Sequence, residues 1–288
     1  MTENGLMFQS TLTKLNYKLV FPLVLGMSLM ACQSNKQDQH GAAHKSNMPA
    51  AQQDTLSYTK KVLKKISPYF SERDGAVDTT YIEISYPEFE NPQMDTVIKS
   101  AILLEGESSI DQYADNFIEG YGNFIEENEV RYNLPWVKFT DVVVVFNSPQ
   151  LMTLSNTTYE FSGGAHGNTF ELIQVVDLEN YRKLALNSFV AEDKMKEFTK
   201  IAEKFFRAEE GLTDTSSLEK DYFFEQGKFA LAANYGILKE GLLLHYNQYE
   251  IKPYAAGTTS VIIPFDAFEA LMTQTGKNYI KQLKAYYQ

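Results

Sequence analysis

The chain has 288 residues and a formal net charge of −11 at pH 7, which is enough length for one large domain or two small ones. An acidic protein is repelled by the phosphate backbone, so we expect no nucleic-acid partner and favour a basic one. Apolar residues make up 44% of the sequence, as is usual for a soluble globular protein.

The first 31 residues have the features of an export signal. Lys14 and Lys18 precede an apolar stretch, residues 19–30, that is too short for a comfortable membrane span. It runs into Leu29-Met30-Ala31-Cys32, the kind of segment that a bacterial lipoprotein signal peptidase cleaves. We therefore expect residues 1–31 to be a signal peptide and Cys32 to carry lipid, with acyl chains such as palmitate. The alternative is an ordinary secretory signal cut elsewhere, with Cys32 an incidental residue.

Lipidation would place the protein in the bacterial cell envelope, anchored to a membrane through Cys32 at the periplasmic or outer-membrane surface. Cys32 is the only cysteine, so packing without disulfides must hold the mature chain together. Loss of residues 1–31 removes two lysines and one glutamate, which leaves a charge of −12. Residues 32–55 are small and polar and predict a flexible tether.

The first part of the fold is predicted to contain two strands followed by two helices. Residues 59–66 and 79–86 have strand patterns, and Asn91-Pro92 predicts a helix start, with Asn as the cap. A second helix is predicted at residues 109–128. Its aromatic stripe is typical of a core face, although a ligand-stacking role is the alternative. The stripe consists of Ile110, Tyr113, Phe117, Tyr121, Phe124 and Ile125.

Three strands follow. Residues 136–146 form the strongest strand pattern, and their continuously apolar part, residues 142–145, predicts a central position in a sheet. We expect residues 151–161 to pair with it as a hairpin and residues 169–178 to leave the next turn as a third strand.

The last third mixes helices and hairpins. A long helix is predicted at residues 192–209 with Gly211 as its stop. Residues 228–235 and 241–246 predict a hairpin around residues 236–240, and residues 259–263 a further strand. Asp266 and Glu269 fit a capping box for a final short helix, residues 267–272. Because repeated βαβ units are lacking, we predict an α+β fold with antiparallel sheets packed against helices.

Two glycine-containing turns are the candidate functional features. In residues 159–167, Gly163 and Gly164 can adopt positive φ and thereby display His166 on a tight turn after Tyr159. In residues 249–257, Tyr249 and Tyr254 lie near a proline and Gly257. Two aromatic rings on a rigid loop suit sugar stacking or a protein interface. The alternative is that the loop shields a sheet edge.

Both turns resemble motifs of the RsiV/PdaC-type extracytoplasmic modules, a family of domains of unknown function. The matching parts of the first motif are Tyr159, Gly163-Gly164-Ala165-His166, the strand 169–178 and Leu184-x-Leu186-x-x-Phe189. Those of the second are residues 241–246, Tyr249-Glu250-Ile251-Lys252-Pro253-Tyr254-Ala255-Ala256-Gly257 and Ile263-Pro264-Phe265. The resemblance implies two consecutive modules, which we expect at residues 56–180 and 181–288.

The resemblance also implies a binding function. One family member is an anti-sigma factor whose external part binds lysozyme, and another carries these modules ahead of a peptidoglycan deacetylase domain. We therefore expect a lipid-anchored envelope binding module whose ligand is a lysozyme or peptidoglycan.

The alternative function is a hydrolase or deacetylase that acts on peptidoglycan through His166. An accessible histidine suits a general base, but the sequence lacks a nucleophile elbow, and His166 can equally lock its turn by a backbone hydrogen bond. We expect His245, on a strand between leucines, to be half-buried and satisfied. No catalytic residue, metal ligand or cofactor is assigned.

Overall fold

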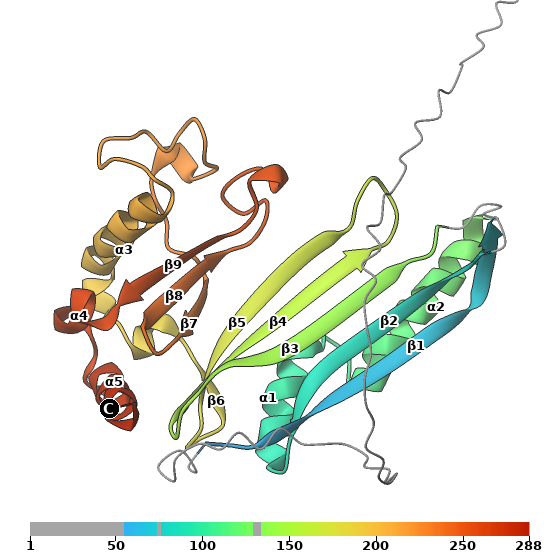
Figure 1. Ribbon diagram of the computed structural model, residues 1–288, viewed down its shortest axis with the longest axis horizontal. Coiled ribbons are helices and arrows are strands. Elements are labelled where there is room, and N and C mark those ends of the chain that lie inside the picture. Colours follow the sequence, from blue (N-terminus) through green and yellow to red (C-terminus); the bar gives the residue numbers. More distant parts are fainter. Residues whose placement is uncertain (1–54, 74–75, 129–133, 288) are drawn as a thin grey trace, which may run out of the picture. The chain divides into compact units, whose positions relative to one another are not determined.

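The first structural layer is a six-stranded sheet. The computed structural model describes residues 55–73, 76–128 and 134–287 (Figure 1), so the predictions for the signal peptide, for Cys32 and for most of the tether lie outside the described residues. The strands follow chain order in the sheet: β1 (Tyr58–Arg73), β2 (Ala76–Phe89), β3 (Val137–Asn147), β4 (Leu151–Phe161), β5 (Asn168–Asp177) and β6 (Arg182–Leu184).

One strand pair in this sheet departs from the expected antiparallel arrangement. β2 and β3 are parallel, whereas every other neighbouring pair is antiparallel. The reason is the connection between them. Two helices, α1 (Pro92–Ile102) and α2 (Ile110–Asn128), carry the chain back across the sheet before β3 begins, and such a crossover is how parallel neighbours are joined.

Helices α1 and α2 cover one face of the six-stranded sheet (Figure 1). The predicted cap of α1 is confirmed, because the Asn91 side chain accepts a hydrogen bond from the N–H of Gln93 at 2.9 Å. The apolar face of α1 is buried and consists of Met94, Val97, Ile98, Ala101 and Ile102. In α2, the stripe packs as expected except at Phe124, which is 39% exposed while its ring lies 5.3 Å from that of Trp136.

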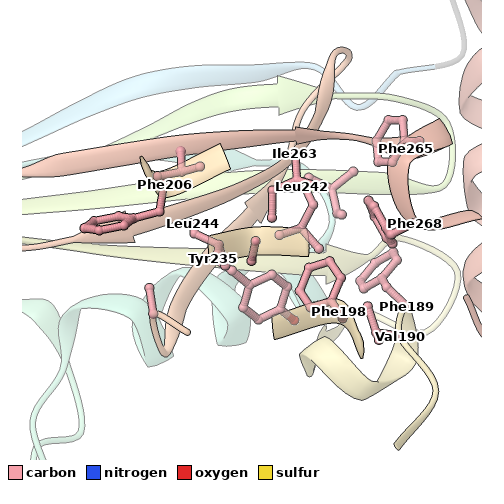
Figure 2. Close-up of a cluster of buried hydrophobic side chains, with 14 of the residues drawn as sticks. Phe189, Val190, Phe198, Phe206, Tyr235, Leu242, Leu244, Ile263, Phe265 and Phe268 are labelled. Atoms are coloured by element: carbon pink, nitrogen blue, oxygen red, sulfur yellow. The ribbon is translucent and has the colours of Figure 1, made fainter. Parts of the chain in front are cut away.

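The second layer is a three-stranded antiparallel sheet of β7 (Asn234–Ile237), β8 (Gly241–Tyr246) and β9 (Thr259–Pro264). It packs with α3 (Met195–Glu209), α4 (Phe265–Phe268) and α5 (Gln274–Tyr286) around an aromatic-rich core. Figure 2 shows part of this core, where the rings of Phe198 and Phe268 meet edge to face at 5.1 Å. The α+β fold with two sheets packed against helices is thus confirmed.

Two predictions for this part were wrong. The hairpin strand expected at residues 228–235 is the shorter β7, and Gly236 lies inside it instead of in the turn. A Cβ at Gly236 would lie 3.0 Å from side-chain atoms of both Ile173 and Thr153, so this glycine permits close approach of the two sheets. Asp266 is not a helix cap, because α4 already begins at Phe265.

A final helix, α5, was not predicted. It begins after Thr273, whose hydroxyl accepts a hydrogen bond from the N–H of Gly276 at 2.8 Å. In the described ranges no helix is long and apolar enough to cross a membrane.

The two sheets meet where β5 runs beside β7. Thr153 of β4 donates its hydroxyl hydrogen to the carbonyl oxygen of Ile237 at 2.6 Å, and the core around Phe198 also contains Leu151 and Val175 of the first sheet. The described residues, from 55 to 287, belong to one compact unit. The boundary between modules at residues 180 and 181 stays a prediction.

Candidate functional site: an aromatic platform between two turns

The two turns predicted from the sequence lie against each other. The ring of His166, on the β4–β5 turn, stacks on the ring of Tyr254 with centroids 4.5 Å apart and an interplanar angle of 20°. The ring of Tyr249 lies 5.3 Å from that of Tyr254. Tyr249 is 51% exposed and His166 is also exposed. We call these three residues the aromatic platform.

The β4–β5 turn displays His166 in the manner that its glycines predict. Gly163 and Gly164 have φ values of 111° and 91°, a region that side chains disfavour. Nδ1 of His166 lies 2.9 Å from the carbonyl oxygen of Gly167. Because a carbonyl oxygen only accepts, Nδ1 carries the hydrogen. This is the backbone lock that the sequence left open as an alternative to catalysis.

Gly167 and Tyr159 form the base of the same turn. A Cβ added at Gly167 would lie 2.4 Å from the Tyr159 ring, so the ring rests directly on the glycine backbone. Tyr159 in turn packs at 6.2 Å from the ring of Phe139 on β3. Tyr159 thus packs against the backbone of the turn that carries His166, and it is not part of the His166–Tyr254 stack.

The second turn is held by a carboxylate that is only 15% exposed. Glu210, which directly follows α3, accepts hydrogen bonds from Lys252 at 2.8 Å, Thr259 at 2.6 Å and Tyr222 at 2.8 Å. Burial alone would raise the pKa of Glu210, but these bonds lower the pKa below its ordinary value. Lys252 lies between Tyr249 and Tyr254 in the sequence, so this cluster holds the platform loop in place.

His245 lies beside the contact between the sheets and is more buried than expected, at 4% exposed. Its Nδ1 is 2.8 Å from the Ser260 hydroxyl, and its Nε2 is 3.5 Å from a carboxylate oxygen of Glu171 on β5. Nε2 makes no hydrogen bond within the part of the chain that the structure describes. The sequence did not reveal the contact with Glu171, because it depends on how the two sheets pack.

The chemistry of the site is that of its partly exposed aromatic rings. Among the residues with described positions, no group of three or more His, Cys, Asp or Glu side chains could hold a metal ion. The platform offers flat, partly exposed rings, which bind by stacking and apolar contact.

Comparisons with known proteins give a family match for each of the two turns. Residues 73–169 match the family model described as deacetylase PdaC, and residues 187–266 match the model of a protein family of unknown function, DUF3298. The chain is thus similar to PdaC over its first matched region and to DUF3298 over its second, and we call these the PdaC region and the DUF3298 region. His166 lies in the PdaC region, whereas Tyr249 and Tyr254 lie in the DUF3298 region. The platform therefore joins the two.

Solved DUF3298 structures share the fold. One from Bacteroides fragilis has a TM-score of 0.66 at 21% identity and covers 81% of this chain and 100% of its own. Another, from Pseudomonas aeruginosa PAO1, has a TM-score of 0.62 at 18% identity and covers 76% of this chain and 95% of its own. No curated protein matches the chain.

Proposed function

We propose that this PdaC–DUF3298 chain is a lipid-anchored binding module of the bacterial cell envelope, and that the aromatic platform is its contact surface for a basic protein of the lysozyme type. The observation that carries the proposal is the His166–Tyr254 stack, which brings rings from two family regions into one exposed surface. Partly exposed tyrosines are frequent at the centres of protein interfaces.

Charge favours a basic protein over a neutral cell-wall glycan as the platform's ligand. The net charge of −11 speeds encounter with a positively charged partner and makes the association sensitive to salt. The proposed lipid at Cys32 and the tether that follows it would hold the module at the membrane surface, where an incoming protein meets it.

Truncation of the platform tests the proposal. We expect Tyr249→Ala to weaken lysozyme binding by roughly tenfold or more, because loss of a central aromatic contact reduces binding by about 1–2 kcal/mol or more. Tyr254→Ala should act at least as strongly, since it also removes the partner of His166. Binding is measured by surface plasmon resonance on each variant.

A matched control is Tyr58→Ala, which truncates a 45% exposed tyrosine on β1 and should leave the affinity unchanged. Equal affinities for wild type and Tyr249→Ala would remove the platform from the interface. If lysozyme does not bind but peptidoglycan fragments do, and Tyr249→Ala weakens them, the platform is a glycan site.

The second candidate, a peptidoglycan deacetylase or hydrolase using His166, is favoured by one observation, the match of residues 73–169 to the deacetylase PdaC model. Its test is acetate release from peptidoglycan by wild type and His166→Ala, together with the metal content of the protein. Turnover that His166→Ala abolishes would establish the enzyme. The bond from Nδ1 of His166 to Gly167 leaves Nε2 able to accept a proton, so the bond alone does not decide the question. Absence of turnover from wild type would remove this candidate.

A further inference from the structure

A separate groove lies on the face of the six-stranded sheet that α1 partly covers. Its volume is about 420 Å³, within the range of roughly 300–1,000 Å³ that is usual for small-molecule sites. One wall is the end of α1 and the chain that follows, residues 100–104. The floor and the other wall come from alternate residues of β3, β4 and β5.

Two opposite charges at the floor of the groove cancel. Lys138 and Glu160 face each other across β3 and β4, with Nζ 3.0 Å from the carboxylate. The Lys138 side chain is only 11% exposed, and its Nζ lies 4.8 Å from the centre of the Tyr113 ring. Among the residues that the structure describes, these two are the only Lys, Arg, Asp or Glu side chains that line the groove, so these residues favour neither an anion nor a cation.

The floor also carries uncharged polar groups. Asn156, at 7% exposed, donates to the carbonyl oxygen of Ala101 at 2.5 Å, and the hydroxyl of Thr158 lies beside its amide. Ser162 and Asn168 continue the polar surface to the β4–β5 turn. Hydroxyl and amide groups both donate and accept hydrogen bonds, so they match a ligand that does the same.

The wall formed by β5 is apolar and open. Phe170 and Leu172 are 44% and 40% exposed, so part of each large apolar side chain faces solvent at the groove. A flat aromatic ring next to donors and acceptors fits a molecule that has hydroxyl edges and an apolar ring face.

We propose that this groove binds an uncharged oligosaccharide, with a sugar ring against Phe170 and its hydroxyls toward Asn156, Thr158 and the Lys138–Glu160 pair. The site is distinct from the aromatic platform. Because side chains alternate along a strand, Phe170 and Leu172 point to the helix-covered face, whereas Glu171 and Ile173 point toward the second sheet, as their contacts with His245 and Gly236 show. The inference therefore does not depend on the proposed function of the platform.

The test uses residues 33–288, which contain every described strand and helix. The probes are three neutral trisaccharides at millimolar concentration: tri-N-acetylchitotriose, cellotriose and maltotriose. Binding is followed by calorimetry and by NMR shifts of the protein. We expect at least one probe to bind, and Phe170→Ser to weaken it roughly tenfold, as expected for loss of one aromatic contact. Leu172→Ser is a second variant, and circular dichroism checks that both fold.

Two controls separate binding in the groove from binding at the platform or at another exposed aromatic ring. Phe223→Ser removes a phenylalanine that is 57% exposed outside the groove, and Tyr249→Ala alters the platform; both should leave sugar binding unchanged. Absence of binding by all three trisaccharides would overturn the proposal, as would equal affinity of wild type and Phe170→Ser. Loss of sugar binding in Tyr249→Ala alone would place the sugar on the platform and equally overturn it.

Discussion

At the residue scale, Gly167 is the position where the platform depends most directly on a missing side chain. An added Cβ would overlap the Tyr159 ring at 2.4 Å, while Gly163 and Gly164 have no atom within 4 Å of an added Cβ and depend on positive φ instead. Gly167 is thus required for packing, whereas Gly163 and Gly164 are required for their backbone conformation.

We predict that Gly167→Ala lowers the free energy of unfolding by about 1–3 kcal/mol, the usual effect of overpacking. In a Tyr159→Ala background the same substitution should have a much smaller effect, because the overlapping ring is gone. Urea denaturation of the four proteins in this double-mutant cycle gives both numbers. Equal effects in the two backgrounds would show that the strain lies elsewhere.

The sequence predicted the glycine turn and its displayed histidine, because φ preferences and close spacing act locally. It did not predict the partner of His166, since the stack with Tyr254 joins residues that are distant in the chain. The groove residues were missed for the same reason. Lys138 and Glu160 are recognisable as a pair only once the register of β3 and β4 is known.

At the element scale, β6 pairs with only the last three residues of β5, and side chains close the neighbouring part of the same edge at Glu171 and Ile173. Asn234 accepts from the N–H of Ile173 at 2.6 Å and donates to the carbonyl oxygen of Glu171 at 2.7 Å. Asn247 bonds both backbone groups of Glu171, at 2.7 and 2.9 Å. These two asparagines join the sheets and protect an edge that could otherwise pair with another chain.

Replacing Asn234 with leucine should lower the free energy of unfolding by about 1–3 kcal/mol, because it leaves the buried N–H of Ile173 without its side-chain partner. The carbonyl oxygen of Glu171 keeps its bond from Asn247. A control is Asn278→Leu on α5, an exposed residue for which we expect a change within about 0.5 kcal/mol. Thermal and urea unfolding measure both. A change at Asn234 no larger than the control would mean that water replaces the lost bonds.

The carboxylate of Glu210 should make the loop that carries the platform sensitive to acid. Its pKa in the folded protein is lowered, so its stabilising contribution is complete above the unfolded value of about 4.3 and is lost as pH falls through the lower, folded pKa. At neutral pH, Glu210→Gln should lower the free energy of unfolding by about 3 kcal/mol, because Lys252 loses its buried partner.

The difference between wild type and Glu210→Gln should begin to shrink below the unfolded value of about 4.3 and should vanish as pH falls through the lower, folded pKa, where the wild-type carboxylate also becomes neutral. Urea midpoints of both proteins from pH 7 to pH 3 measure it. A difference that stays constant across this range would contradict the lowered pKa.

At the scale of the whole molecule, composition and hydrophobic periodicity were enough to predict an α+β fold, most helices and the order of the first sheet's hairpins. The predictions from sequence were wrong where tertiary packing determines the structure and the local sequence pattern does not. Gly236 resembles a turn residue but serves the approach of two sheets, and the parallel β2–β3 pair results from a crossover that local patterns do not specify.

The central claim is that the module binds a basic protein through the aromatic platform, and it rests on the acidic net charge and on the exposed rings of the platform. The most direct test is calorimetric titration of residues 33–288 with lysozyme at low and at high salt. The account predicts tight binding at low salt that weakens markedly as ionic strength rises. Absence of heat at both salt concentrations, confirmed by an independent binding assay, would contradict it.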